Sequence, residues 1–290
     1  MLPPIIQLLR PRQWVKNAFV FLPLFFDKKL TDIGVLTLTL VCAIVFSLAA
    51  SAVYCLNDIM DREADAAHPV KCRRPIASGA VSTSAGWTAM AICLIGAVAL
   101  TAALLPASVL WILLAYLALN ILYSTWLKHV ALVDVLIVSC FYVMRVVAGA
   151  AAGDIEPSQW IVVMTFLLAL FLVLGKRRDD VMLQADGGRV VRRGAAGYNL
   201  DFINMALTMV ATITIVAYMI YTMSDDVAQR FGSHYTYCTT AFVLAGILRY
   251  MQLTVVDNHS GSPTAVLMRD RFIQLCVAGW VMAFLIIIYC

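Results

Sequence analysis

Long apolar runs separated by short polar stretches dominate the pattern of hydrophobic and polar positions along the 290-residue chain. Runs of about 17–24 residues suit helices that cross a hydrocarbon core about 30 Å thick. The pattern predicts about nine such spans. We place them at residues 15–27, 34–57, 84–104, 107–126, 132–152, 158–175, 202–223, 235–253 and 271–289. The first is the shortest and runs into a charged turn at residues 27–29.

Composition supports the same class of protein. Apolar residues make up 62% of the chain and charged residues only 13%, against about a quarter charged in soluble domains. We therefore expect an all-α polytopic membrane protein that forms one integral membrane domain over residues 1–290. The cysteines are scattered singly and the histidines lack metal-ligand spacing, so no zinc site is predicted. No nucleotide-binding glycine loop or nucleic-acid partner is predicted either.

The basic residues predict the orientation. If the N-terminus is cytoplasmic and the spans alternate, nearly all lysines and arginines fall on the cytoplasmic side. The exceptions are Lys28, Lys29 and Arg230 on the opposite side and Arg145 inside a span. The sequence therefore predicts a multi-pass protein of the plasma (inner) membrane. Two motif loops, at residues 58–83 and 176–201, would face the cytoplasm.

An acidic motif, N-D-x-x-D-x-x-x-D, follows the second predicted span. Asn57, Asp61 and Asp65 are four residues apart and would share one helix face, with Asp58 beside them. At about 1.5 Å per residue, the outer two lie about 12 Å apart, too far to hold one ion whose oxygen ligands lie about 2 Å away. One or two Mg²⁺ ions bridged by substrate phosphates would fit this face. The alternative is a solvated acidic helix end.

Basic residues follow the acidic motif directly. Lys71, Arg73 and Arg74 precede Pro75 and Gly79, and these last two residues predict a turn that bends the loop back over the membrane surface. The loop would then offer phosphate donors close to the metal ligands.

A second charged motif follows the sixth predicted span. Lys176, Arg177 and Arg178 stand beside Asp179 and Asp180. Arginine presents a fork to phosphate oxygens and lysine acts as a point charge. Ordinary positive-inside loops also explain basic residues here. Both motifs lie at cytoplasmic span ends, so two halves of a bundle could direct them at one central cavity.

Three further residues are candidates. Tyr123 and Lys128 lie at the cytoplasmic end of the fourth predicted span, where an interfacial anchor is the alternative. Arg145 lies near the middle of the fifth predicted span, where an arginine needs a polar cavity or a partner. A structural salt bridge is the alternative, although Asp134 lies too far along the same helix to be its direct partner.

These motifs resemble the UbiA-type intramembrane prenyltransferase superfamily, and in particular its phosphoribosyltransferase branch. The segments that carry the resemblance are R-P-R-Q-W-V-K-N at 10–17, the acidic motif at 57–65, R-R-P-I-A-S-G at 73–79, Y-S-T-W-L-K at 123–128, G-K-R-R at 175–178 and P-T-A-V-L-M-R-D at 263–270. The acidic motif and R-R-P-I identify only the superfamily. The opening segment, G-K-R-R and L-M-R-D indicate the branch.

The resemblance implies a UbiA-like bundle of nine helices around a central cavity. It also implies Mg²⁺-dependent transfer of phosphoribosyl from 5-phosphoribosyl 1-diphosphate to a polyprenyl phosphate in a lipid membrane, with release of diphosphate. The product would be a precursor of the arabinose donor for cell-envelope polysaccharide. The resemblance also implies a homo-oligomer, for which a trimer is compatible with this branch of the family.

On this reading each candidate residue has a role. The metal ligands are Asn57, Asp58, Asp61 and Asp65. The donor phosphates are held by Lys71, Arg73, Arg74, Lys176, Arg177 and Arg178, with Arg145 as a further substrate-binding candidate. Lys16 holds the acceptor phosphate, Tyr123 and Lys128 line the cavity wall, and Asp58, Asp61 and Lys16 are the catalytic residues.

Two other functions are weighed against this one. A UbiA-type enzyme that transfers a prenyl group from a prenyl diphosphate to an aromatic acceptor has a second D-x-x-x-D motif after the sixth span. Here Leu183 and Gln184 stand where that second aspartate is expected, and whether Asp179 and Asp180 bind a second Mg²⁺ is left open. A transporter of anionic lipids gives no reason for a metal-binding helix face.

Overall fold

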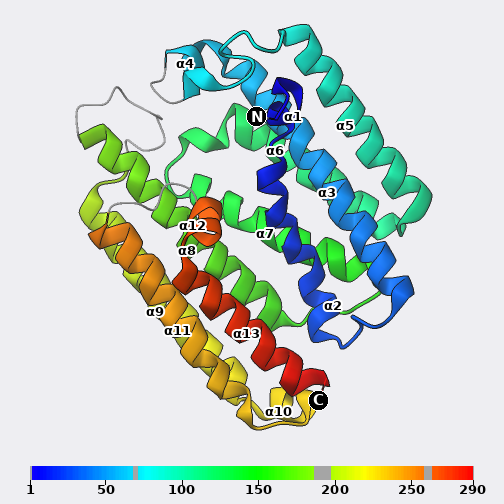
Figure 1. The fold of residues 1–290 in the computed structure, drawn as a ribbon, viewed down its shortest axis with the longest axis vertical. Coiled ribbons are helices and arrows are strands. Elements are labelled where there is room, and N and C mark those ends of the chain that lie inside the picture. Colours follow the sequence, from blue (N-terminus) through cyan, green and yellow to red (C-terminus); the bar gives the residue numbers. More distant parts are fainter. Residues whose placement is uncertain (1, 68–70, 186–196, 258–262, 290) are drawn as a thin grey trace. The chain divides into compact units, whose positions relative to one another are not determined.

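The computed structural model describes residues 2–67, 71–185, 197–257 and 263–289, and in these ranges every regular element is helical (Figure 1). The long helices are α3 (Ile33–Met60), α5 (Thr83–Leu104), α6 (Ala107–Thr125), α7 (Val133–Ala152), α8 (Gln159–Ala185), α9 (Leu200–Met223), α11 (Thr240–Met251) and α13 (Arg271–Tyr289). The short ones are α1 (Pro4–Leu9), α2 (Leu22–Phe26), α4 (Arg62–Ala66), α10 (Asp225–Phe231) and α12 (Pro263–Arg269).

Non-α helices connect several of these elements. They are the 3₁₀ helices Pro11–Phe21, Lys71–Arg73, Leu127–His129 and Tyr235–Thr239, and the π-helical turn Gln252–Val256 that extends α11. Residues 68–70 and 186–196 of the two predicted motif loops lie outside the described residues.

Eight helical stretches in the described part of the chain are long and apolar enough to cross a membrane. They coincide with the predicted spans from 34–57 onward, which confirms the all-α polytopic class. Helix α8 continues to Ala185, beyond the end of the predicted span at 175. The second charged motif therefore lies on the last turns of a helix.

The first predicted span, 15–27, has a different structure. The 3₁₀ helix Pro11–Phe21 of 11 residues is followed by the five-residue α2. A 3₁₀ helix rises about 2.0 Å per residue against 1.5 Å for an α-helix, so the two together extend about 30 Å, comparable to a hydrocarbon core. The predicted count of nine spans and the cytoplasmic N-terminus stay predictions.

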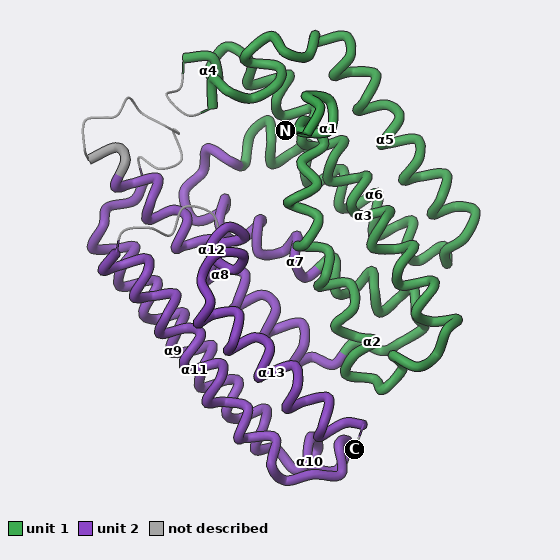
Figure 2. Tube along the Cα trace, in the orientation of Figure 1, with its two compact units in different colours: residues 1–127, 144–157 green, residues 128–143, 158–290 purple. Residues whose placement is uncertain are grey.

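The chain divides into two compact units (Figure 2). Unit 1 comprises Met1–Leu127 and Met144–Pro157, and unit 2 comprises Lys128–Val143 and Ser158–Cys290. Helix α7 contributes its first half to unit 2 and its second half to unit 1. The predicted single catalytic domain and its one central cavity stay predictions.

Unit 1 is organised around α3. This helix packs along α5 and also contacts the 3₁₀ helix Pro11–Phe21, α1 and α6. Asp32 caps its N-terminus by accepting hydrogen bonds from the next turn. Beneath the acidic motif, Leu8, Cys55, Ile76 and Val81 form a small buried apolar cluster. The end of α3 that carries the motif therefore packs against α1 and the loop that follows the motif.

Unit 2 is built from α8 against α9 and α11 against α13. Its core includes Phe171, Ile203 and Leu207. At Gly175, just before the second charged motif, an added Cβ would lie only 2.6 Å from the Tyr250 hydroxyl. Glycine at this position leaves room for the Tyr250 side chain of α11 against α8.

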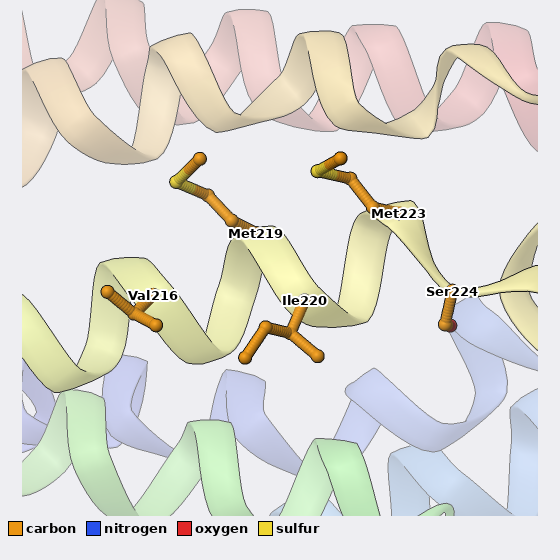
Figure 3. A pocket seen from close by; sticks show the side chains of 5 residues that line it. All are labelled: Val216, Met219, Ile220, Met223 and Ser224. Carbon is orange, nitrogen blue, oxygen red and sulfur yellow. The ribbon is translucent and has the colours of Figure 1, made fainter.

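The outward face of α9 is apolar. Val216, Met219, Ile220, Met223 and Ser224 line a shallow hollow at the end of this helix, and Figure 3 shows Met219 and Met223 pointing to the same side. Met223 is 68% exposed. Because lipid tails are apolar, such side chains can face outward from a membrane helix without a cost in free energy. This surface suits lipid, and a phosphate would find only the Ser224 hydroxyl there.

Candidate active site

The acidic motif keeps its predicted helical spacing although α3 ends before it is complete. Helix α3 ends at Met60, Asp61 adopts a turn, and α4 begins at Arg62. The backbone hydrogen bonds nevertheless continue, from the Asp61 amide to the Asn57 carbonyl at 2.9 Å and from the Asp65 amide to the Asp61 carbonyl at 2.8 Å. The residues predicted to share one face are thus linked at successive turns.

Two carboxylates of the motif are buried against two arginines. Asp58 is 1% exposed and Asp65 3% exposed. Arg10 donates to Asp58 Oδ1 at 2.5 Å, and Arg74 Nη1 lies 3.2 Å from the same oxygen and 2.5 Å from Asp65 Oδ2. We call these four residues the acid–arginine cluster. It is balanced in charge and lies within unit 1.

Arg10 is fixed by more than this ion pair. Its guanidinium stacks on the Tyr54 ring at 4.8 Å from the centroid. Its backbone has φ 52° and ψ 56°, a left-handed conformation at the junction between α1 and the 3₁₀ helix. Such a conformation costs about 1–2 kcal/mol in a non-glycine residue, and the contacts of Arg10 offset this cost at the junction of the two helices.

The cluster fits a divalent cation. Asp58 Oδ2 is buried and has no hydrogen-bond partner among the described residues. A buried carboxylate oxygen of this kind is costly unless something positive approaches it. No three His, Cys, Asp or Glu side chains in the described ranges converge on one point. Magnesium suits such a site because it commonly takes one or two carboxylates and completes its shell with water and phosphate.

The basic loop turns back as predicted. The Val81 amide bonds to the Pro75 carbonyl at 2.9 Å, and Gly79 has φ +77°, which favours glycine. Ile76 is 2% exposed in the apolar cluster beneath the motif. This anchor places Arg74 against the acids. The predicted phosphate ligands Lys71 (half-buried) and Arg73 (exposed) lie on the short 3₁₀ helix before it.

The 3₁₀ helix Pro11–Phe21 packs one polar face on α3. Trp14 Nε1 donates to Ser51 Oγ at 3.0 Å, and Asn17 Nδ2 donates to Ser47 Oγ at 2.7 Å. With three residues per turn, Trp14 and Asn17 lie on the same face. Lys16, the predicted acceptor-phosphate ligand, lies on a different face and is half-buried. Its role stays a prediction.

Arg145 is buried at 5% exposure within unit 1. Its Nε donates to Asn17 Oδ1 at 2.7 Å and its Nη2 to the Tyr116 hydroxyl at 3.0 Å. Its guanidinium also lies 5.1 Å from the centre of the Tyr116 ring. These contacts assign Arg145 to holding the 3₁₀ helix, while phosphate binding by Arg145 stays a prediction. Asp134 is not its partner, as the spacing indicated.

In unit 2, Arg177 joins two helices. It is 2% exposed and its Nε lies 2.8 Å from Asp134 Oδ2, while Nη1 pairs with Asp180 on the next turn of α8. Asp134 Oδ1 accepts a hydrogen bond of 2.8 Å from the Tyr198 hydroxyl. Burial raises the pKa of Tyr198, so the phenol remains protonated and donates. Asp134 thus ties together the start of α7, the end of α8 and the residues before α9.

The other two basic residues of this motif differ in exposure. Arg178 is 6% exposed. It donates to Asn204 Oδ1 at 2.9 Å and to the Thr254 carbonyl at 2.5 Å. Lys176 is exposed. Lys176 is therefore the most accessible of the three predicted phosphate ligands, and the ion pairs and hydrogen bonds of Arg177 and Arg178 position α8. The roles of all three as ligands stay predictions.

Tyr123 and Lys128 occupy neighbouring elements. Tyr123 is half-buried in the last turn of α6, and Lys128 is half-buried in the 3₁₀ helix Leu127–His129. Their predicted place on a cavity wall stays a prediction.

The late L-M-R-D segment has a structural role in unit 2. Asp270 Oδ1 accepts from the Ile273 amide at 2.9 Å, which caps α13. Its Oδ2 accepts from Arg249 Nη2 at 2.8 Å and Nε at 3.1 Å. These hydrogen bonds, first of all the one from Arg249, lower the pKa of the Asp270 carboxyl.

Asp270→Asn is expected to lower the unfolding temperature by a few degrees and to weaken its acid dependence. Because the folded pKa is lowered, the carboxylate stabilises the protein above about pH 4 and loses this effect as the pH falls further. Thermal unfolding in detergent between about pH 3 and 6 measures both effects. Exposed Asp201 on α9 supplies the control Asp201→Asn. Equal acid dependence in the two variants would contradict the assignment.

Several residues of these clusters could not be assigned from sequence. Arg10 belongs to the opening motif, but its ion pair with Asp58 spans 48 residues. Asn17, Tyr116 and Asp134 are polar residues in apolar segments, and that is the only signal the sequence carries for them.

The chain is similar to known proteins over nearly its whole length. The chain is 33% identical over 282 residues to decaprenyl-phosphate phosphoribosyltransferase of Mycobacterium tuberculosis, covering 96% of this chain and 91% of the relative. It is 30% identical to the protein of the same name from Corynebacterium glutamicum, covering 98% and 86%. A UbiA homologue from Archaeoglobus fulgidus, solved with DMAPP and Mg²⁺, matches with a TM-score of 0.72 and 17% identity over 98% of both chains.

The family model of the UbiA prenyltransferase family matches residues 19–184, which include the acidic motif, the basic loop and the G-K-R-R motif. This match spans more than half of the chain, and the chain belongs to the UbiA prenyltransferase family.

Proposed function

We propose that this protein transfers the 5-phosphoribosyl group of 5-phosphoribosyl 1-diphosphate to a polyprenyl phosphate in the membrane and releases diphosphate. The observation that carries the proposal is the identity of 30–33% to decaprenyl-phosphate phosphoribosyltransferases over nearly the whole chain. The acid–arginine cluster supports it with buried carboxylates for a metal ion and guanidinium groups for phosphate.

In this reaction the C1–O bond to the diphosphate breaks and a bond forms between C1 and an oxygen of the lipid phosphate. The acceptor is anionic at neutral pH, so no general base is needed. Asp58 and Asp65, with Asn57 and Asp61 on adjacent turns, would hold Mg²⁺. When bound, Mg²⁺ would neutralise charge on the departing diphosphate.

The chain's own residues bind and orient the substrates. Arg74, Lys71 and Arg73 lie before the turn and would donate to the donor's phosphates, with Lys176 as the exposed candidate of the second motif. Lys16 would hold the acceptor phosphate. Holding two anions in line at C1 and excluding water accounts for much of the acceleration in such reactions.

We further propose that the protein lies in the plasma membrane and that this site opens to the cytoplasm. The donor is a soluble phosphorylated metabolite, and the basic loops are on the side that positive-inside orientation assigns to the cytoplasm.

The test uses purified protein, Mg²⁺, radiolabelled 5-phosphoribosyl 1-diphosphate and a polyprenyl phosphate, followed by lipid extraction. Label in an acid-labile lipid is the expected result, and Asp61→Ala is expected to abolish it because Asp61 is assigned to the metal. Near-normal turnover of that variant would contradict the metal assignment. An unlabelled lipid, together with transfer from a prenyl diphosphate to an aromatic acid, would instead support the aromatic prenyltransferase.

A further inference from the structure

We propose that Arg74 makes the acidic motif selective for a divalent ion that arrives with a diphosphate, and against the free ion. The proposal rests on the proposed function, in which a metal-bound diphosphate is the leaving group. It gives Arg74 two successive partners: the carboxylates in the free protein and the diphosphate in the complex.

The position of a single nitrogen atom supports this inference. Arg74 Nη1 lies 3.2 Å from Asp58 Oδ1 and 2.5 Å from Asp65 Oδ2. It therefore bridges two buried carboxylates, as a cation shared by both would. The second oxygen of Asp58 stays buried and has no hydrogen-bond partner in the described parts of the chain. Arg74 thus occupies the bridge without satisfying all the acceptors there.

The charges of the cluster oppose a free ion. Arg10 and Arg74 already balance Asp58 and Asp65. With Asp61 of the motif counted as well, the group carries one net negative charge, and a divalent ion that entered alone would give a largely buried group a net positive charge, where repulsion is weakly screened. A diphosphate reverses this balance because it brings negative charge and accepts the guanidinium fork. Metal and diphosphate should therefore bind with strong mutual enhancement.

The two arginines are suited to different roles. Arg10 is held by Asp58 and by the Tyr54 ring, and its backbone lies at the left-handed junction between α1 and the 3₁₀ helix. The side chain of Arg74 is 26% exposed, and its backbone is anchored two residues away by buried Ile76. Arg74 can therefore exchange partners while the loop keeps its place, and Arg10 continues to neutralise Asp58.

The experiment measures the Mn²⁺ retained with the full-length protein in detergent after equilibrium dialysis, because diphosphate itself binds Mn²⁺ in solution and the protein-bound ion must be counted separately. Titrations are made without and with inorganic diphosphate. Wild-type protein should bind Mn²⁺ weakly alone, and diphosphate should raise the affinity about tenfold or more. Arg74→Gln should bind Mn²⁺ alone about tenfold more tightly than wild type and should lose most of the enhancement by diphosphate.

Arg62→Gln is the matched control. Arg62 is exposed on α4 beside Asp61, and the substitution removes the same positive charge as Arg74→Gln. It should behave like wild type. The proposal is overturned if, without diphosphate, Arg74→Gln binds Mn²⁺ no more tightly than wild type. It is also overturned if Arg62→Gln gains as much Mn²⁺ affinity as Arg74→Gln.

Arg74→Lys tests the same proposal if Arg74→Gln fails to fold. It keeps the charge and loses the fork, so Mn²⁺ alone should still bind weakly while the enhancement by diphosphate falls. Unchanged enhancement would contradict the proposal. None of these titrations uses 5-phosphoribosyl 1-diphosphate or the lipid acceptor. A chain that failed the transfer assay could therefore still show the Arg74 effect, so the two proposals fail separately.

Discussion

Asp58→Asn is expected to reduce phosphoribosyl transfer about 100- to 1000-fold, the scale of losing one preorganised electrostatic contact at a reacting site. The substitution removes a carboxylate that is 1% exposed and that both arginines of the acid–arginine cluster contact. Asn keeps the shape of the side chain but not its charge. The metal ion would then lose a ligand, and both guanidinium groups would lose a charged partner.

Turnover is measured by the labelled-lipid assay, together with thermal unfolding to confirm that the variant is folded. Glu63→Gln is the matched control because Glu63 is an exposed carboxylate on α4, within the same motif. It should retain wild-type turnover. A folded Asp58→Asn protein with turnover within about tenfold of wild type would show that the charge of Asp58 is not used.

Gly149→Ala is expected to lower the unfolding temperature by several degrees and to reduce transfer. A Cβ at this position would lie 1.9 Å from the Val20 carbonyl oxygen and 2.8 Å from its carbon. These are backbone atoms of the 3₁₀ helix, so no side chain can rotate away. Overpacking of this kind typically costs about 1–3 kcal/mol, and occasionally more. The displaced 3₁₀ helix would carry Arg10 and Lys16 with it.

Gly96→Ala makes the same chemical change in another membrane helix. There the added Cβ would meet only Leu48 Cδ1, at an ordinary 3.6 Å. Its unfolding temperature should stay close to that of wild type. If both variants unfold at the same temperature in detergent, the close approach between α7 and the 3₁₀ helix is not rigid, and the reasoning about that contact is wrong.

The sequence predicts local features of the fold well. Apolar runs locate the long helices, and the four-residue spacing of the acids survives in the backbone hydrogen bonds between Asn57, Asp61 and Asp65. The turn at Pro75 and Gly79 also forms. Each of these follows from interactions between residues close along the chain, where spacing and residue type decide the geometry.

Partners that are distant along the chain could not be predicted in this way. The place of Arg145 in the middle of an apolar span indicates that it needs a polar partner, but one of its partners, Asn17, is 128 residues away. Arg177 likewise joins Asp134 from another helix. A pattern of hydrophobic and polar positions says which face of a helix is buried, and it does not say which of several polar groups meets that face.

The 3₁₀ pitch was also hidden, because tertiary contacts hold it. Runs of this type seldom exceed three or four residues, yet this one has 11. Hydrogen bonds to Ser47 and Ser51, the hydrogen bond from Arg145 and the close approach of Gly149 to Val20 stabilise it.

The long 3₁₀ helix also limits how the length of this part of the chain can vary. With three residues per turn, an insertion or deletion of one residue rotates everything beyond it by about 120° and takes Asn17 or Val20 off the packed face. A change of three residues restores the faces and alters the length by about 6 Å. Homologous chains that keep this helix should therefore differ in its length by multiples of three residues.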